Sequence, residues 1–595
     1  MIWRNSFWIF LLILTLGFLI YSNTFQSSFH LDDESSIVEN YRIQNIGMPG
    51  LIWEYSRERF LAYLTFALNY RFGGLNTFGF HLINLTIHIL ASWIVFLLIR
   101  ITFRTPALVS HSLTKHSHTL ALFSSLLFLT HPIQTQAVTY IVQRIASLTA
   151  LFYLASVTFY AKARLENNRL FYGLALFTTY ASMFTKQIAF TLPFTLALYE
   201  FTFFGKQDLK SKLLRLAPFL ASAAVIPVLT AIHGATASQA GQDSALIPVE
   251  TKLISRSDYL LTQFNVVRTY LRLLVFPVNQ NLDYDYPIST TPADLPTFLS
   301  LLLHAGMIVG AFRLLKNHRM ISFGIFWFYL TLSVESGIIP IKDVIFEHRL
   351  YLPMFGFVLA FTSFIFLLLK NTRKFSLIFS LLVLAFSGMT YLRNKVWKDE
   401  LSLWADVIHK SPDKARPNNT LGAAYGDLGD FEKAERYLEK AIQINPRHPM
   451  AYFNLGAVRG KQGLLEEKTK YYEKALEVNP KLVKAYGNLG AIYGKKGNPG
   501  KALEFLNRAL SLDPRYVPAY YNLGVTYAKM GNYPKAARAL EKTIQINPSH
   551  AQARYTLGLV YLERGNLEGA LAQAVKLQDL NPELAQALVR KLEAL

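Results

Sequence analysis

Residues 81–102 read HLINLTIHILASWIVFLLIRIT, an apolar stretch whose one formal charge, Arg100, lies near its end. A helix of about 20 predominantly apolar residues is long enough to cross the hydrocarbon core of a bilayer. The stretch therefore predicts a transmembrane helix, and it decides the fold class. Comparable stretches recur along the chain at 7–22, 119–131, 146–162, 170–185, 187–204, 214–233, 297–315, 321–340, 351–370 and 375–393.

Together these stretches predict about eleven spans in an all-α membrane domain. Of the 595 residues, 52% are hydrophobic and the mean hydropathy is +0.24, which is too apolar for an ordinary soluble protein. The average hides two unlike parts, because the chain becomes polar and continuously patterned beyond residue 410. We expect a polytopic membrane domain over 1–395, a linker over 396–416 and a soluble domain over 417–595.

The formal net charge of +21 would suit nucleic-acid binding if it formed one basic surface. Many of the Lys and Arg residues instead lie in short loops between apolar stretches, where they determine membrane topology. We therefore expect membrane lipids as partners and no nucleic acid. The chain contains no cysteine, which excludes disulfides, thiol catalysis and Cys-ligated metals.

The basic loops predict how the membrane domain is oriented. In an alternating arrangement they share one side with Arg4, and the positive-inside rule makes that side cytoplasmic. The loop residues are Arg100, Arg104, Lys115, Lys162, Arg164, Arg169, Lys206, Lys210, Lys212, Arg215, Arg313, Lys316, Arg319, Lys370, Arg373 and Lys374. The extracytoplasmic side then receives 23–80, 234–296, the stretch IKDVIFEHR and everything after Tyr391. The run 7–22 lacks a convincing small-residue cleavage site, so we expect an uncleaved first span.

The soluble part repeats every 34 residues from Pro417 onward. The repeated pairs are Leu421–Gly422, Leu455–Gly456, Leu489–Gly490, Leu523–Gly524 and Leu557–Gly558, and a proline closes each unit. This period and pattern resemble the tetratricopeptide repeat (TPR), a helix hairpin that stacks into a superhelical solenoid. We expect five repeats and a capping helix over the tail ALVRKLEAL. Such arrays bind peptides or proteins in a concave groove, although any single Tyr or Asn here is equally explained as repeat core.

Six stretches of the membrane part, taken in order, resemble a known family. They are DDESSIVEN (32–40), RFLAYLTFALNYRFGGLNTFGFHLINLTIH (59–88), HPIQTQAVTYIVQR (131–144), SMFTKQIAFTLPFTLALYE (182–200), YLRLLVFPVNQNLDYDYP (270–287) and VESGIIPIKDVIFEHRLYLP (334–353). They are similar to the protein O-mannosyltransferase clan of GT-C membrane glycosyltransferases. The TMTC-type branch is the best match, because it also joins a multispan domain to C-terminal TPRs.

The resemblance implies transfer of a mannose-like sugar from a polyprenyl-phosphate donor to Ser or Thr of a protein on the extracytoplasmic side. It implies a GT-C domain with an acidic pair in its first outer loop, and that pair falls on Asp32 and Asp33. A carboxylate can take the proton of a hydroxyl acceptor as the new bond forms. The second carboxylate could raise one pKa of the pair, orient its neighbour or share a divalent metal with it. Glu34 reads as a solvated residue.

Several cations are candidates for holding the phosphate of the donor. Arg268 and Arg272 lie on an amphipathic stretch that is either an interfacial helix gripping phosphate or a helix with snorkelling arginines. Family positions also fall on Arg59, Arg144, His348 and Arg349, with supporting roles for Gln143, Lys186 and Glu347. Asp33, Glu347 and His348 are the candidates for a metal, whose presence stays open. Lys186 could instead anchor an interface, and Glu347 with its neighbours could form a structural ion pair. His81 and His88 read as packed, hydrogen-bonded core residues.

The sequence departs from the family pattern at three places. Gln136 and Gln187 stand where relatives often have Glu, and Phe60 replaces the usual Pro. A Gln keeps the size and hydrogen bonding of Glu but loses its charge, so a required acid at either position would be missing. Because Asp32 and Asp33 are retained, we expect an active enzyme.

Three alternatives remain beside protein O-glycosylation. The enzyme could modify a surface polysaccharide or lipid, it could resemble an oligosaccharyltransferase or O-antigen ligase, or the chain could be a non-catalytic membrane-anchored TPR scaffold. The early acidic pair disfavours the ligase, because such enzymes carry their large loop late. The absence of a transit or retention signal predicts a bacterial inner-membrane protein. Its catalytic loop and TPR domain would then lie in the periplasm, and its N-terminus in the cytoplasm.

Overall fold

The computed structural model describes residues 2–44, 46–205, 208–240, 254–341 and 343–594. Within them every regular element is helical, as the sequence predicts. The chain divides into two compact units: the first comprises residues up to 233 and 254–412, and the second comprises 413–594 with 234–240 at the end of α12. Lys206 and Lys342, which belong to the predicted loops, lie outside the described residues.

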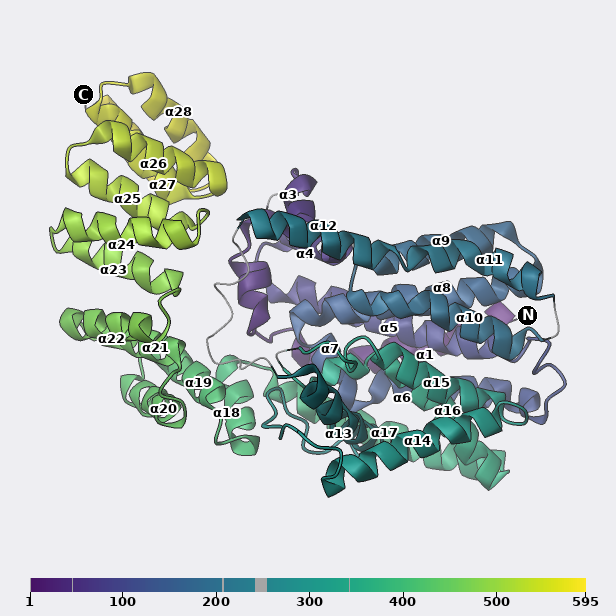
Figure 1. Ribbon diagram of the computed structural model, residues 1–595. Helices are drawn as coiled ribbons and strands as arrows, with labels where there is room; N and C mark the ends of the chain where they lie inside the picture. The colour runs from purple at the N-terminus through teal and green to yellow at the C-terminus, as the bar shows by residue number, and fades with distance from the viewer. Residues whose placement is uncertain (1, 45, 206–207, 241–253, 342, 595) are drawn as a thin grey trace. The chain divides into compact units, whose positions relative to one another are not determined.

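The first unit is a bundle of apolar helices that run roughly parallel to one another (Figure 1). Its core is continuous and reaches from Ile9 on the first helix to Phe379 on the last long one. The helices at the expected spans are α1 (Ile2–Ile20), α5 (Thr77–Thr102), α6 (Ser117–Thr130), α8 (Arg144–Glu166), α9 (Arg169–Met183), α10 (Leu192–Phe203), α11 (Leu209–Ser222), α12 (Val225–Ala240), α14 (Leu295–Leu314), α15 (Arg319–Leu332), α16 (Pro353–Leu369) and α17 (Thr372–Val396).

Length and composition suit five of the described helical stretches to crossing a membrane: Thr77–Thr102, Ile141–Glu166, Leu209–Ile232, Leu295–Leu314 and Thr372–Val396. Three shorter apolar helices, Phe7–Ile20, Arg319–Leu332 and Pro353–Leu369, coincide with further expected spans. Every expected span therefore overlaps a helix, although α15 ends at Leu332, short of the expected residue 340, and the number of eleven crossings stays a prediction. Local signals fix some of the ends, because the Asn76 side chain caps α5 and Asn167 ends α8 in a left-handed conformation with φ +48°.

Two segments hold more structure than the sequence indicated. The first loop contains α2 (Tyr41–Gln44), α3 (Pro49–Tyr55) and α4 (Phe60–Gly73). The segment expected as a linker contains α18 (Glu400–Lys410), which buries Leu403, Trp404 and Val407. These three apolar residues lie on one face of a helix, and their burial makes α18 part of the first unit. The predicted amphipathic stretch is α13 (Arg256–Val275).

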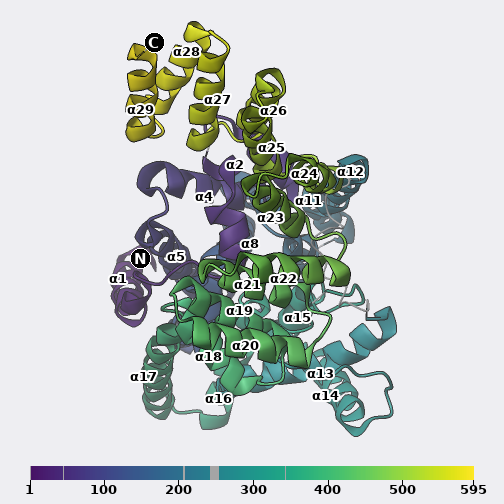
Figure 2. The ribbon, with the colours of Figure 1, turned by 90° about the vertical axis from the view of Figure 1, so that its left-hand side faces the viewer.

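The second unit contains the five predicted helix hairpins and the capping helix, each hairpin packed as an antiparallel pair (Figure 2). The hairpins are α19 (Ala415–Asp427) with α20 (Phe431–Ile444), α21 (Pro449–Lys461) with α22 (Leu465–Val478), α23 (Val483–Lys495) with α24 (Pro499–Leu512), α25 (Val517–Lys529) with α26 (Tyr533–Ile546), and α27 (Ala551–Glu563) with α28 (Leu567–Gln578). The cap, α29 (Pro582–Glu593), begins at a proline, which suits the first helical position.

Glycine serves the repeats in two ways, although in the fifth repeat Gly558 packs against Leu588 of the cap and not against its paired helix. The turn between the paired helices contains a glycine in the left-handed region, for example Gly497 with φ +72°. The glycine after the repeated leucine lets the helices approach, since a Cβ placed on Gly490 would lie 2.5 Å from Leu506 Cγ. This spacing confirms why small residues recur at that position.

Candidate active site

Asp33 is fully buried and tied to the backbone at both ends of its carboxylate. Its Oδ2 accepts a hydrogen bond from the His30 N–H at 2.9 Å, and its Oδ1 accepts one from the Val142 N–H at 2.7 Å. Burial raises the pKa of the Asp33 carboxyl well above its ordinary value, against the effect of these two donors. Asp33 thus joins the first loop to the segment that leads into α8.

Asp32 has the opposite environment, because its side chain is exposed. Its backbone N–H donates to the Tyr140 hydroxyl at 2.9 Å, and its carboxylate also contacts that hydroxyl, so Tyr140 holds the main chain of an exposed acid. Leu31, just before it, adopts a left-handed φ of +46°. A non-glycine residue pays about 1–2 kcal/mol for that conformation, and such strain recurs at functional sites. Of the two predicted acids, Asp32 is therefore the one available to a substrate.

Arg144 lies completely inside the protein and all its contacts are internal. Its guanidinium donates to Asn84 Oδ1 at 2.7 Å, to the Phe80 carbonyl at 2.9 Å and to Thr65 at 3.2 Å and 3.3 Å. It also stacks over the Phe66 ring at 4.6 Å. This geometry favours a structural clamp joining α4, α5 and α8 over the predicted contact with a donor phosphate.

A second group of predicted residues gathers around Lys186 and Glu335. Lys186 Nζ pairs with Glu335 Oε1 at 2.7 Å, and both side chains are close to nine-tenths buried. The guanidiniums of Arg59 and Arg349 lie near enough to act electrostatically on Lys186. Three cations thus surround one carboxylate, and the cluster as a whole is positive.

His348 belongs to this cationic cluster. Burial, followed by the charges of Lys186, Arg349 and Arg59, lowers the pKa of its imidazole well below the ordinary value. The ring is therefore neutral at pH 7. Its Nδ1 is buried and finds no hydrogen-bond partner among the described residues. A neutral imidazole beside fixed cations can still donate one hydrogen bond to an anion.

Arg349 holds the loop that supplies the cluster. It is 3% exposed, and its guanidinium donates to the carbonyls of Asp343 at 2.7 Å, Val344 at 3.0 Å and Glu335 at 3.4 Å. Three donors are thereby committed to backbone oxygens. This arrangement favours a positioning role for Arg349, with its charge still added to the cluster.

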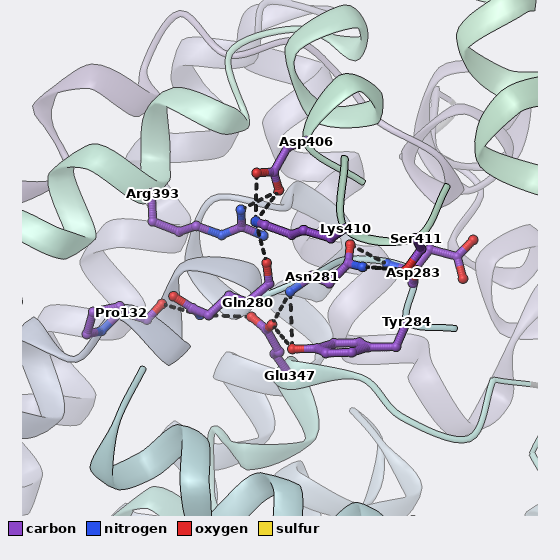
Figure 3. Close-up of polar contacts among 10 residues, drawn as sticks. All are labelled: Pro132, Gln280, Asn281, Asp283, Tyr284, Glu347, Arg393, Asp406, Lys410 and Ser411. Carbon is purple, nitrogen blue, oxygen red and sulfur yellow. Dashed lines mark hydrogen bonds and ion pairs between the residues drawn. The ribbon is translucent and has the colours of Figure 1, made fainter. Parts of the chain in front are cut away.

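Glu347 is 2% exposed and saturated by neutral donors (Figure 3). It accepts hydrogen bonds from Gln280 Nε2 at 2.8 Å, the Asn281 N–H at 2.7 Å and the Tyr284 hydroxyl at 2.5 Å. Burial raises the pKa of its carboxyl. These contacts join the short 3-10 helix Glu347–Leu350 to the segment that follows α13, and they differ from the expected ion pair with a neighbour.

The segment 131–144 links the acidic pair to the cationic cluster. Near the start of this segment, Gln136 Oε1 accepts a hydrogen bond from the His348 N–H at 2.6 Å. At its later part Tyr140 and Val142 hold Asp32 and Asp33. Gln136 is 1% exposed, so the missing carboxylate would have been a buried charge at this junction. Two regions more than three hundred residues apart are thus held by one short stretch of chain.

The remaining predicted residues lie away from these contacts. Arg272 is exposed and donates to the Val278 carbonyl at 3.1 Å, while Arg268 contacts the Tyr286 hydroxyl. Gln143 is half-buried, and its backbone N–H donates to the Tyr140 carbonyl at 3.1 Å. His81 and His88 are buried and hydrogen-bonded, as expected for core residues.

The predicted metal candidates find no common site. Within the described chain no group of three or more His, Asp or Glu side chains lies close enough to hold an ion. The oxygens of Asp33 and Glu347 already accept hydrogen bonds from the protein. The residues present therefore give no support to a bound metal at these positions.

Sequence reasoning missed Glu335 and Tyr140. Glu335 stands in the quoted stretch VESGIIP, where a charge within an expected span signals a partner. Tyr140 stands in the quoted stretch HPIQTQAVTYIVQR, but nothing in its local pattern indicates that it meets Asp32.

Comparison with known proteins bears on both units. The tetratricopeptide-repeat family pattern matches residues 416–448, 451–482, 483–516 and 521–585. A crystal structure of YrrB, titled as a TPR protein with an unusual peptide-binding site, is 25% identical and aligns with a TM-score of 0.27, covering 31% of this chain and 97% of that one. The repeats thus carry a recognised family pattern.

Two relatives each align with nearly three quarters of the chain. Protein O-mannosyl-transferase F38B6.6 of Caenorhabditis elegans is 25% identical over 465 residues, 74% of this chain and 63% of its own length. Protein O-mannosyl-transferase TMTC4 of Homo sapiens is 24% identical over 499 residues, 72% of this chain and 66% of its own length. The chain spans about two thirds of each of these relatives. It is therefore a homologue of the TMTC-type protein O-mannosyltransferases with a C-terminal region of tetratricopeptide repeats.

Proposed function

We propose that the chain is a GT-C-type glycosyltransferase that moves a mannose-like sugar from a polyprenyl-phosphate donor to a hydroxyl group. The observation that carries this is the division between two neighbouring acids. Asp33 is buried with both oxygens bound to backbone N–H groups, whereas Asp32 exposes its carboxylate on a backbone that Tyr140 fixes. A general base needs both exposure and a fixed position.

In the proposed reaction the acceptor oxygen forms a bond to the anomeric carbon of the sugar. The bond from that carbon to the phosphate oxygen breaks, and its electron pair leaves with the lipid phosphate. The acceptor proton passes to Asp32. No oxidant or further reactant is needed, because the proton and the leaving group balance the step.

The cationic cluster supports the same proposal from the leaving-group side. Lys186 and Arg59 would stabilise the negative charge that develops on the departing phosphate, and His348 would donate a hydrogen bond to it. The nearby Glu335 holds Lys186 in place without cancelling the positive charge of the cluster. A phosphate carried by a lipid would lie at the level of the headgroups, where the ends of apolar helices also lie.

We further propose that the acceptor is a Ser or Thr of a protein that the TPR region recruits. A repeat solenoid offers an extended surface for peptides, and relatives named protein O-mannosyl-transferases support protein as the acceptor. The basic loops support an outer position for the first loop and the repeats. In a bacterium that compartment would be the periplasm.

The experiment is a donor panel. The purified chain, reconstituted in lipid nanodiscs, is incubated with polyprenyl-phosphate mannose, glucose and galactose and with Ser/Thr-containing acceptor proteins. Mass spectrometry of the acceptor should find hexose on Ser or Thr with one of these donors. The absence of transfer and of donor hydrolysis with every donor, while the protein stays folded, would favour the TPR scaffold instead.

A further inference from the structure

The turn between α17 and α18 touches both sides of the candidate site. The residues concerned are 393–411, which comprise the end of α17, the turn at Trp397, the helix α18 and the following Ser411. All of them belong to the first unit. Arg393, Trp397 and Trp404 are buried here and Asp406 and Lys410 are half-buried, although the sequence predicted only a linker from residue 396 onward.

Trp397 contacts the side of the site that holds the acidic pair. The indole is 1% exposed and stacks on the Tyr140 ring with centroids 5.5 Å apart. The Trp397 carbonyl lies 2.8 Å from His30 Nε2, and the Ser28 N–H donates to the neighbouring Lys398 carbonyl at 3.1 Å. Tyr140 and His30 are the residues that fix the backbone of Asp32 and the carboxylate of Asp33. The turn therefore supports the whole acidic pair.

Lys410 contacts the other side, where Glu347 precedes His348. Its Nζ donates to the Gln280 carbonyl at 2.7 Å and pairs with Asp406 at 2.6 Å and 2.8 Å. Gln280 in turn donates its side-chain N–H to Glu347, and Figure 3 shows these side chains converging. Arg393 completes the arrangement by pairing with Asp406 at 2.7 Å.

Ser411 adds a second connection to the same segment. Its Oγ accepts hydrogen bonds from Asn281 Nδ2 at 2.9 Å and from the Asp285 N–H at 3.2 Å. Asn281 is also the residue whose backbone N–H binds Glu347. The end of α18 thus holds the segment 280–285, and that segment holds the backbone next to His348.

We propose that Trp397 and Lys410 are positioning residues: they keep the acidic pair and the cationic cluster in fixed positions relative to each other for the transfer reaction. This rests on the proposed function. Neither residue touches the substrate; each acts through a partner, Tyr140 for the first and Gln280 with Glu347 for the second. Because reacting groups must be placed to within about 1 Å, loosening either contact reduces turnover more than donor binding.

The test compares Lys410→Met with Arg164→Met in the full chain. Both changes remove one cation from a largely buried ion pair, since Arg164 NH2 lies 2.8 Å from Glu200 Oε1. Arg164 lies about 30 Å along α8 from Arg144 at the rise of an α-helix, which places it away from the site. We expect kcat per folded molecule to fall at least tenfold in Lys410→Met, with donor KM changed less than twofold, and to stay unchanged in Arg164→Met. Lys410→Arg should restore most of the turnover.

A second readout does not depend on transferase activity. Amide hydrogen exchange should accelerate at Asn281 and His348 in Lys410→Met, and at His30 and Asp33 in Trp397→Leu, with Trp397→Phe close to the wild type. Equal exchange at these amides in all variants, or equal loss of kcat in the Arg164 control, would overturn the proposal. A wild-type protein that transfers no sugar would defeat the proposed function, while the exchange result would still decide the positioning claim.

Discussion

Asp32 and Asp33 are neighbours in the sequence, yet the structure predicts opposite consequences for the same substitution. Asparagine has nearly the shape of aspartate but only one acceptor oxygen. In Asp33→Asn the amide NH2 must face either the His30 N–H or the Val142 N–H, because both carboxylate oxygens now accept from these donors. One hydrogen bond is lost and a buried N–H is left without an acceptor.

The size of the Asp33→Asn effect follows from that orphaned donor. Leaving a buried backbone N–H unsatisfied costs about 1–3 kcal/mol in the free energy of unfolding. The neutral amide avoids the burial of a charge, which offsets part of the loss, so we expect about 1–2 kcal/mol. In Asp32→Asn the side chain is exposed and its hydrogen-bonded backbone is unchanged, so stability should change by less than about 0.5 kcal/mol.

The assay is thermal unfolding of the full chain in detergent, followed by tryptophan fluorescence and paired with the transfer rate. Asp33→Asn should lower the Tm, and Asp32→Asn should leave it unchanged. Transfer should fall by about 10²–10⁴ in Asp32→Asn, the usual contribution of a general base. Equal unfolding temperatures for the two variants, or greater activity in Asp32→Asn than in Asp33→Asn, would refute the division of roles.

Four further outcomes follow from the contacts of single residues. Arg144→Leu should destabilise the first unit by about 2–4 kcal/mol in thermal unfolding, because several buried oxygens lose their donors, and donor KM should change little. Lys186→Met should lower kcat/KM for the donor at least tenfold in steady-state kinetics, since the negative charge that develops on the leaving phosphate loses a cation. The depressed pKa of His348 means that its neutral form favours folding: Tm should be constant above about pH 6.5, fall as the pH drops toward the lowered folded pKa, and depend less on pH in His348→Asn. Gly490→Ala should speed proteolysis of the repeats by forcing a Cβ against a neighbouring helix, whereas Gly500→Ala, at a site with more room, should not.

The sequence sufficed for the parts of the fold that depend on local pattern. Apolar stretches such as 81–102 predict helices because a span needs length and composition alone, and each expected span does overlap a helix. The TPR hairpins were predictable because every repeat carries its own close-packing glycine and the turn that ends its first helix. The helix α18 was missed, although LSLWADVI places apolar residues on one helical face.

The site itself depends on long-range contacts that no local pattern contains. Nothing in DDE distinguishes Asp32 from Asp33, because the difference arises from Val142, more than a hundred residues away. From the sequence Arg144 looks like a phosphate ligand, and only its partners on α4 and α5 show that it is committed inside the protein. In the same way, only the ion pair with Glu335 shows how Lys186 is held. The residue types therefore indicated acid–base and phosphate-binding chemistry. The tertiary structure was needed to separate the roles of residues that look equivalent in the sequence, such as Asp32 and Asp33.

The most direct test of the central claim separates donor binding from proton removal. The Asp32→Asn protein is loaded with the donor that the wild type uses, and both the donor Kd and the single-turnover rate of sugar transfer are measured. If Asp32 is the base, the Kd stays within about twofold while the transfer rate falls by about 10² or more. A single-turnover rate equal to that of the wild type would contradict the account.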